Sequence, residues 1–251
     1  MDKALIRHRF AKASGSYPRQ AFVQRDIALR MADLIGRYVS PDSHRRVLEI
    51  GCGTGLFTRA YLHRWCPERL VLNDLCPEVE PYFADLLGGQ VSFVAKDAEA
   101  LDFPSGQDLI MSCSALQWFD APERFLLGCR KLLSGRGYLA FSTFGPHNAE
   151  EIRALTDAGL PYRPLDELKV ALSEAYHIVH ASEACVQLSF PTPLDVLRHL
   201  KDTGVTGIRP CHWTRKKLAD FSMRYAGRYA APGGGVTLTY HPIYIICQLK
   251  K

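Results

Sequence analysis

Short apolar runs alternate with amphipathic segments along the first 144 residues of the chain. Each apolar run has the length of a buried strand. The predicted strands are 46–50, 69–74, 91–97, a stretch within 108–118, and 137–144. The segments with a helical period of apolar residues are 21–39, 56–65, 77–87 and 123–133. This alternation predicts a parallel, doubly wound sheet with right-handed crossovers.

The second half of the chain has a different pattern, which is mainly helical from residue 145 to about residue 213. Its other predicted elements are a strand at 184–190, a helix at 214–229, and strands at 236–240 and 243–249. Only His241 and Pro242 separate the last two strands. Because this connection is too short for a helical crossover, we expect an antiparallel terminal hairpin.

Together the patterns predict an α/β, doubly wound, Rossmann-like fold with a seven-stranded sheet and a mainly helical cap inserted after strand five. The cap would fold over the strand ends, where ligands bind in open α/β sheets. The predicted division is an N-terminal lid and helix at 1–40, a core at 41–145 and 214–251, and a substrate-binding cap at 146–213.

Composition narrows the class of protein. The chain has 251 residues, 47% of them hydrophobic, and no run of 18 apolar residues that would span a membrane. Its N-terminus carries charges where a secretory signal needs an apolar segment. The eight cysteines include no CxxC pair, so we expect reduced thiols and a cytoplasmic location. His63 and Cys66 have the nearest ligand spacing, but without a second pair we expect no metal site.

A glycine-rich loop follows the first predicted strand, in VLEIGCGTGLFTR. Its spacing is Gly51-x-Gly53-x-Gly55, which differs from the GxGxxG of dinucleotide-binding proteins. Glu49 stands two residues before the first glycine, where an acid is unfavourable beside a pyrophosphate. An acid there suits a ligand with an ammonium group and no phosphate, such as S-adenosylmethionine. The glycines would allow close backbone approach and tight turning.

Further acids follow the next two strands. Asp74 ends the second strand, nineteen residues after Gly55, where it could accept hydrogen bonds from both ribose hydroxyls. Asp97, Ala98 and Glu99 follow the third strand, near the expected adenine edge. Each acid alone could instead be a turn residue or a helix cap.

With Glu49, these acids make 46–144 and the terminal strands resemble the class I S-adenosylmethionine-dependent methyltransferases. The predicted cofactor contacts include Leu75, Ser112 and, on the first helix, Gln24. Gln24 could contact the methionine tail or be an exposed helix residue. The product of the cofactor would be S-adenosylhomocysteine.

Four further segments narrow the resemblance. They are RFAKASGSYPRQAFVQRDIA near the N-terminus, SALQWF at 114–119, FSTFGPHNAEEIRALTDAGLPY at 141–162, and LRHLKDTGVTGI at 197–208. Together they resemble the malonyl-[acyl-carrier-protein] O-methyltransferases of biotin synthesis. That resemblance implies methyl-ester formation on the free carboxylate of a malonyl thioester held by acyl carrier protein. The ester would let a fatty-acid elongation system extend the chain towards pimeloyl.

This chemistry needs alignment more than proton transfer. A malonyl carboxylate is ionised at neutral pH, and the methyl group on a cationic sulfur is already electrophilic, so no general base is required. We expect single hydrogen-bond donors near the reacting oxygen, and the candidates are Tyr17 and Trp118. Tyr17 lies in a Gly/Ser/Pro loop that could close as a lid. Both residues could instead be packing aromatics.

The chain's net charge of +5 equals the surplus of one segment. The segment 198–217 contains only one acidic residue, Asp202. Its basic residues are Arg198, Lys201, Arg209, Arg215, Lys216 and Lys217. We expect Arg198, His199 and Lys201 to bind the malonyl group or the carrier's phosphopantetheine, with Phe144 lining the substrate channel. The charged residues could equally be a solvated helix face, and Phe144 a core residue.

The predicted partner is acyl carrier protein, and we expect a monomer that binds neither nucleic acid nor membrane. One alternative is a methyltransferase for a small free carboxylic acid. A nucleic-acid methyltransferase is disfavoured, because no [N/D]PP[Y/F] motif follows the fourth strand. The last alternative is a non-catalytic S-adenosylmethionine-binding module.

Overall fold

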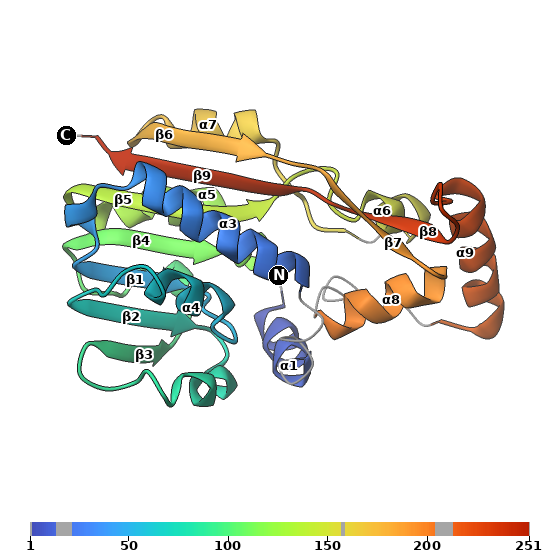
Figure 1. Ribbon diagram of the computed structural model, residues 1–251, viewed down its shortest axis with the longest axis horizontal. Coiled ribbons are helices and arrows are strands. Elements are labelled where there is room, and N and C mark those ends of the chain that lie inside the picture. Colours follow the sequence, from blue (N-terminus) through green and yellow to red (C-terminus); the bar gives the residue numbers. More distant parts are fainter. Residues whose placement is uncertain (1, 14–21, 157–158, 204–212, 251) are drawn as a thin grey trace.

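The computed structural model describes residues 2–13, 22–156, 159–203 and 213–250 (Figure 1). A seven-stranded sheet in the order β3-β2-β1-β4-β5-β9-β6 forms its centre. Its strands are β1 Arg46–Ile50, β2 Arg69–Asp74, β3 Val91–Ala95, β4 Gln107–Cys113, β5 Leu133–Phe144, β6 Tyr176–Glu183 and β9 Pro242–Leu249. The first five strands pair in parallel, and β9 is antiparallel to both β5 and β6. The predicted α/β doubly wound class with a seven-stranded sheet is confirmed.

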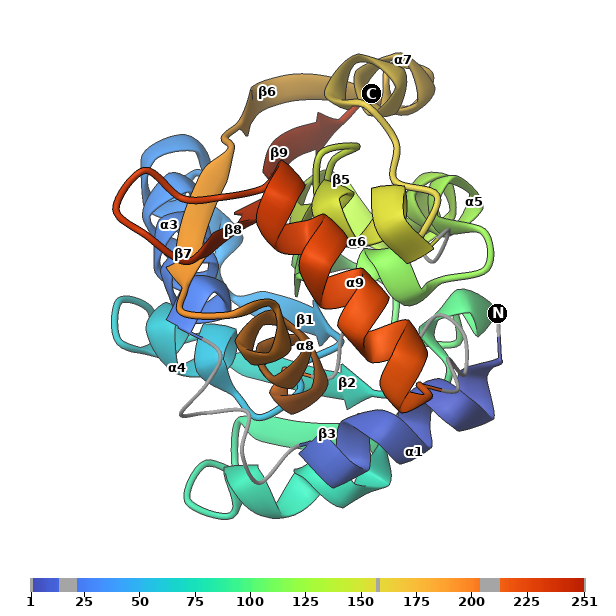
Figure 2. The ribbon, with the colours of Figure 1, turned by 90° about the vertical axis from the view of Figure 1, so that its right-hand side faces the viewer.

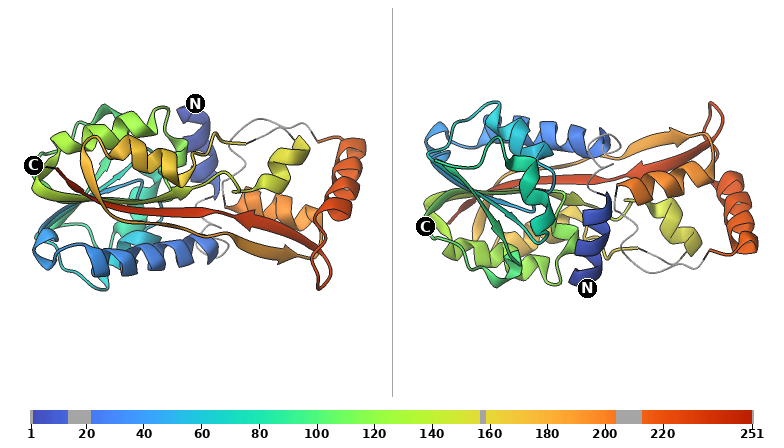
Figure 3. Two further views of the ribbon diagram at one scale, coloured as in Figure 1. Left: turned by 90° about the horizontal axis from the view of Figure 1, so that it is seen from above. Right: turned by 90° about the horizontal axis from the view of Figure 1, so that it is seen from below.

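Helices cover both faces of the sheet (Figure 3). The helices α3 Phe22–Tyr38 and α4 Leu56–Leu62 lie on one face, and α5 Pro122–Gly128 and α7 Leu165–Leu172 lie on the other. Short 3-10 turns are η1 Pro41–Ser43, η2 Pro77–Phe83, η3 Ala98–Ala100, η4 Leu116–Trp118 and η5 Cys129–Lys131. The predicted helix at 77–87 is therefore a 3-10 turn, and Pro81 inside it cannot donate a helical hydrogen bond.

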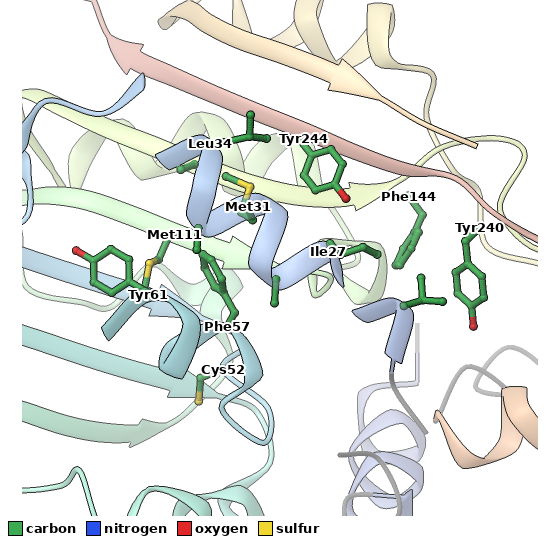
Figure 4. Packing of buried hydrophobic residues seen from close by; sticks show 14 of the residues in the cluster. Ile27, Met31, Leu34, Cys52, Phe57, Tyr61, Met111, Phe144, Tyr240 and Tyr244 are labelled. Carbon is green, nitrogen blue, oxygen red and sulfur yellow. The ribbon is translucent and has the colours of Figure 1, made fainter. Parts of the chain in front are cut away.

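The core follows from the strand pleat. Val47 of β1 belongs to the cluster under α3 and α4, and its neighbour Leu48 belongs to the cluster under α5 and α7. In the first cluster Met31 of α3 and Tyr61 of α4 are fully buried, and they pack with Met111 of β4 (Figure 4). This packing fixes the position of β1 and of the glycine loop that follows it.

The last two strands do not form the predicted hairpin. Strand β8 (Val236–Tyr240) pairs with β7 (Val186–Phe190) in a separate two-stranded sheet, while β9 pairs with β5 and β6. The chain continues from β8 into β9 through His241 alone, so β7–β8 and β6–β9 form consecutive parts of one antiparallel ribbon (Figure 1). The hairpin prediction is wrong because the true partner, β6, was not predicted as a strand.

A cap lies beyond the carboxyl ends of the parallel strands (Figure 2). It contains β7 and β8 with the helices α6 Glu150–Thr156, α8 Pro193–Asp202 and α9 Arg215–Arg228. Two edges of the predicted division therefore need correction. Helix α7 and strand β6 lie within the predicted cap but belong to the layers of the main sheet, whereas α9 and β8 lie within the predicted core but build the cap.

The helix α1 (Lys3–Ala13) lies apart from the layers, beside the carboxyl end of the sheet (Figures 1 and 2). Within the described ranges, no helix has the length and apolar character needed to cross a membrane. The seven cysteines in those ranges have no disulfide partner.

Candidate active site

A pocket opens at the carboxyl ends of the parallel strands, with about 1190 Å³ of empty space including its mouth. Its walls come from the ends of β1, β2 and β4, from the turn after β3, and from α1 and α3. The predicted site residues that line it are Gln24, Gly51, Gly53, Asp74, Leu75, Asp97, Ala98, Glu99 and Trp118. The strand-end motifs therefore converge on one cavity of ligand size.

The glycine loop has the conformation that its sequence predicts. Gly51, Gly53 and Gly55 have φ values of 68°, 54° and 86°, a region that residues with a Cβ avoid. A Cβ on Gly51 would lie 2.4 Å from the Cβ of Ala115, and one on Gly55 would lie 2.8 Å from the ring of Phe83. The loop thus combines a left-handed backbone with close packing on its outer side.

Asp74 ties two backbone segments together. Its Oδ2 accepts from the amide of Gly53 at 2.9 Å, and its Oδ1 accepts from the amide of Cys76 at 2.9 Å. Burial raises the pKa of Asp74, and these amide donors oppose that shift. The carboxylate therefore fixes the glycine loop against the turn after β2 while it faces the pocket.

Asp97 and Glu99 have partly structural roles. Asp97 accepts from the amide of Glu99 at 3.0 Å and caps the turn after β3. Glu99 accepts from the amides of Asp120 at 3.0 Å and Ala121 at 2.8 Å. Both carboxylates also accept from Nζ of Lys3, at 2.7 Å for Asp97. The alternative of a turn or cap residue is thus correct for these acids, although they also line the pocket.

Glu49 is buried but is not a pocket-lining residue. Burial, with a smaller contribution from the charge of Asp74, raises the pKa of Glu49 to about 8 against the opposing effect of Thr58. Its Oε2 has no hydrogen-bond partner among the residues placed in the structure. Ser112 is also buried and outside the lining, and its Oγ likewise has no hydrogen-bond partner among the described residues.

Several polar atoms of the pocket wall lack a partner in the described part of the chain. They are Oε1 of Gln24, Oγ1 of Thr54 and Oγ of Ser114. Gln24 is buried, so its interpretation as an exposed helix residue is wrong. Ser114 has a φ of 56°, a strained backbone conformation of the kind that often marks a functional site. Buried polar groups normally have a partner, so these atoms fit a pocket that holds a polar ligand.

Of the two predicted catalytic residues, Trp118 and Tyr17, the structure describes only Trp118. Trp118 is half-buried in η4 and lines the pocket, as a donor to the acceptor group would need to. Tyr17 lies outside the described residues. Sequence reasoning missed the pocket residues Cys113 and Ser114, although their place at the end of β4 and directly after it was the available signal. It also missed the pocket role of the α1 residues, although Phe10 lies in the quoted N-terminal segment RFAKASGSYPRQAFVQRDIA.

The cap residues do not gather at one site. Arg198 is exposed and paired with Asp195 at 2.7 Å, and Lys201 is exposed. His199 is buried, with Nε2 2.8 Å from the hydroxyl oxygen of Tyr240, and burial lowers its pKa. Phe144 is buried against Tyr240, with ring centroids 6.2 Å apart. None of the four lines the pocket, so their substrate roles stay predictions.

No cluster of three or more His, Cys, Asp or Glu residues suited to a metal ion occurs within the ranges that the structure describes.

Comparisons with known proteins agree with this geometry. A methyltransferase-domain family model matches residues 48–141. The chain is 49% identical over 262 residues to the malonyl-[acyl-carrier protein] O-methyltransferase of Bacteroides thetaiotaomicron, with both chains fully covered. It is 50% identical to the Bacteroides fragilis protein of the same name over 99% of its own length, but it spans about half (51%) of that relative.

Among solved structures, a putative methyltransferase from Bacillus halodurans has a TM-score of 0.63 at 14% identity, covering 87% of this chain and 97% of its own. This likeness shows the fold, whereas the full-length identity to the Bacteroides thetaiotaomicron protein shows the family. The chain belongs to the malonyl-[acyl-carrier protein] O-methyltransferase family.

Proposed function

We propose that this chain transfers a methyl group from S-adenosylmethionine to the free carboxylate of a malonyl thioester carried by acyl carrier protein, forming a methyl ester. The observation that carries the proposal is the strand-end pocket, in which the glycine loop and Asp74 meet, in a chain of this family. We propose that this ester is an early intermediate in making the pimeloyl moiety of biotin.

The cofactor side is the better defined part. Gly51 and Gly53 let a ligand approach the backbone, and the carboxylate of Asp74, which lines the pocket, is the proposed acceptor for the ribose hydroxyls. Gln24 presents an unpartnered oxygen suited to an ammonium group. S-adenosylmethionine supplies a methyl group on a cationic sulfur. The proposed contacts are the pocket-lining members of the predicted set, with Leu75, Asp97, Ala98 and Glu99 at the adenine end, whereas Glu49, Gly55 and Ser112 lie outside the lining.

On the acceptor side, the protein's task is to exclude water and align one carboxylate oxygen with the methyl carbon. The carboxylate is ionised at neutral pH, so the new oxygen–carbon bond forms as the carbon–sulfur bond breaks, with no proton to move. Trp118 at the pocket and Tyr17 beyond the described residues are the proposed single donors. A bidentate cation would weaken the nucleophile, which favours such donors.

The proposed partner surface is the outer side of α8 and α9. Lys201, Arg215, Lys216 and Lys217 are exposed, and none forms an ion pair within the described ranges. Arg209 lies outside those ranges. Because such a surface attracts an acidic protein, we propose that it docks the carrier. We also propose a cytoplasmic monomer that binds no nucleic acid, divided into lid, core and cap at the corrected edges.

A methyltransferase for a small free acid is the second candidate, since the pocket alone does not distinguish the acceptors. The test is methyl transfer from labelled S-adenosylmethionine to malonyl-acyl carrier protein, with acetyl-acyl carrier protein, malonyl-coenzyme A and free malonate as comparison acceptors. We expect label in an ester on the malonyl carrier and none on the acetyl carrier. Label on free malonate alone would favour the second candidate. Cofactor binding without transfer to any acceptor would contradict both.

A further inference from the structure

The helix α1 presents one face to the cofactor pocket. Lys3, Ile6, Arg7 and Phe10 all line it, and their spacing of i, i+3, i+4 and i+7 places them on one side of the helix. Charged side chains stand towards the N-terminal half of this face, and the aromatic ring stands towards its C-terminal end. Neither the glycine-loop motif nor the strand-end acids drew attention to these residues.

Lys3 joins α1 to the adenine end of the pocket. Its Nζ lies 2.7 Å from Asp97, in hydrogen-bond contact with Glu99, and 3.5 Å from Asp120. The hydrogen bonds to Asp97 and Glu99 raise the pKa of Lys3 against the opposing effect of its burial. A single cation thus links the helix to the acids of the turn after β3 and to the loop before α5.

Arg7 makes a second link, one helical turn along. Its guanidinium donates to both oxygens of Glu78, at 2.7 and 3.3 Å. This pairing holds the pKa of Glu78 near 2. Glu78 belongs to η2, directly after the Asp74 turn, so Arg7 fixes α1 to the ribose side of the pocket.

Phe10 lies in the last turn of α1, after Lys3 and Arg7, and its ring approaches the glycine loop. A Cβ on Gly53 would lie 3.3 Å from Cζ of Phe10. The ring therefore stands over the same glycine whose amide bonds Asp74. An 11-residue helix is marginal on its own in water, so its position depends on what it contacts.

We propose that Lys3 and Arg7 are positioning residues that hold α1 as the outer wall of the cofactor pocket, with Phe10 in contact with the bound cofactor. This inference rests on the cofactor part of the proposed function and is independent of the acceptor. Release of the cofactor requires α1 to leave, and its two ion-pair links must break for that to happen.

The test measures how fast S-adenosylhomocysteine dissociates from the full chain in stopped-flow experiments. We expect Lys3→Met to speed dissociation about tenfold, because charge-assisted hydrogen bonds are lost. Arg7→Glu should speed it about fivefold, and adding Glu78→Arg to that variant should restore the rate to within about threefold of wild type. Phe10→Ala should weaken binding about tenfold through lost aromatic contact.

The matched control is Arg45→Glu, which breaks an exposed pair with Glu68 of similar geometry just before β1, away from the pocket. It should leave the dissociation rate unchanged. Raising the salt concentration should speed dissociation from wild type and have little effect on the Lys3→Met, Arg7→Glu double variant.

Unchanged dissociation in Lys3→Met and Arg7→Glu would overturn the proposal, as would a charge-swapped pair no slower than Arg7→Glu alone. Failure of wild type to bind S-adenosylhomocysteine would instead refute the proposed cofactor. Binding without methylation of the malonyl carrier would refute only the proposed acceptor.

Discussion

The cofactor pocket and the cap of this protein are built in different ways. The pocket is assembled from residues directly after neighbouring parallel strands, and backbone geometry sets most of it, as at Gly51 and Gly53. The cap is assembled from segments far apart in the chain, which side-chain contacts join. Examples are the pair His199 and Tyr240, and Glu151 with Thr239. The pocket therefore depends on local conformation, whereas the cap depends on long-range packing.

If this contrast is correct, the largest effect should come from the glycine loop. Gly51→Val would place a branched side chain against Ala115 in a left-handed conformation. We expect a loss of about 3–5 kcal/mol of stability, with loss of cofactor binding. Denaturant unfolding and S-adenosylhomocysteine titration measure both.

The control for that variant is Gly135→Val, because Gly135 has no heavy atom within 4 Å of its would-be Cβ. It should behave as wild type. A stable Gly51→Val protein that still binds the cofactor would refute the backbone account of the pocket.

The second effect concerns the buried acid behind the loop. Because burial raises the pKa of Glu49 to about 8, the native state keeps a proton that the unfolded chain releases at lower pH. The stability that Glu49 contributes is thus fully present below about pH 4.5 and is lost as the pH rises through about 8. Between pH 5 and pH 8 we expect wild type to lose about 1–3 kcal/mol relative to Glu49→Gln. Parallel pH profiles of unfolding for the two proteins would contradict a neutral buried carboxyl.

The third effect concerns Asp74, which combines a structural and a ligand-facing role. Asp74→Ala removes the acceptor for the amides of Gly53 and Cys76, so we expect cofactor affinity to fall about thirtyfold. Isothermal titration measures the affinity. Asp85→Ala, which loses only a surface pair with Arg59, should bind normally. Equal affinities for Asp74→Ala and wild type would show that the ribose assignment is wrong.

The smallest effect should come from the cap surface. Reversing two charges, Lys216→Glu with Lys217→Glu, should raise KM for the malonyl carrier about fivefold at low salt, with kcat unchanged. The control reverses the charges of Lys131 and Arg136. Lys131 lies just before β5 and Arg136 lies near its start, at the end of the sheet away from the cap. If both double variants have the same KM, the docking surface lies elsewhere.

The same contrast explains what could be predicted from the sequence. The strand-end residues of the pocket were predictable because each ends or follows a strand with a clear apolar pattern, and parallel strands bring their ends together. Strand β6 was not predictable from the sequence. Its segment YHIVHASE is half-exposed at the edge of the sheet and has no regular alternation of apolar residues. The contacts of Lys3 were not predictable either, because α1 reaches acids about 94 residues away that no periodicity connects to it.

His199 shows the limit for single residues. Its place among Arg198 and Lys201 suggested a charged binding face, yet the helix turns it inward between the rings of Phe22 and Phe190. Only the three-dimensional arrangement of α3 and β7 distinguishes a ligand-binding histidine from a packed one.

The ribbon that runs through His241 has a consequence for engineering. The polypeptide passes between sheet and cap four times: between β5 and α6, between α6 and α7, between β6 and β7, and between β8 and β9. The last two passages are adjacent in space. Exchanging the cap with that of a relative would require four splices, two of them in paired strands whose registers must match. Acceptor preference in such chimeras will therefore be limited by how well the strands align across the joints, before any difference in the transplanted surface can be tested.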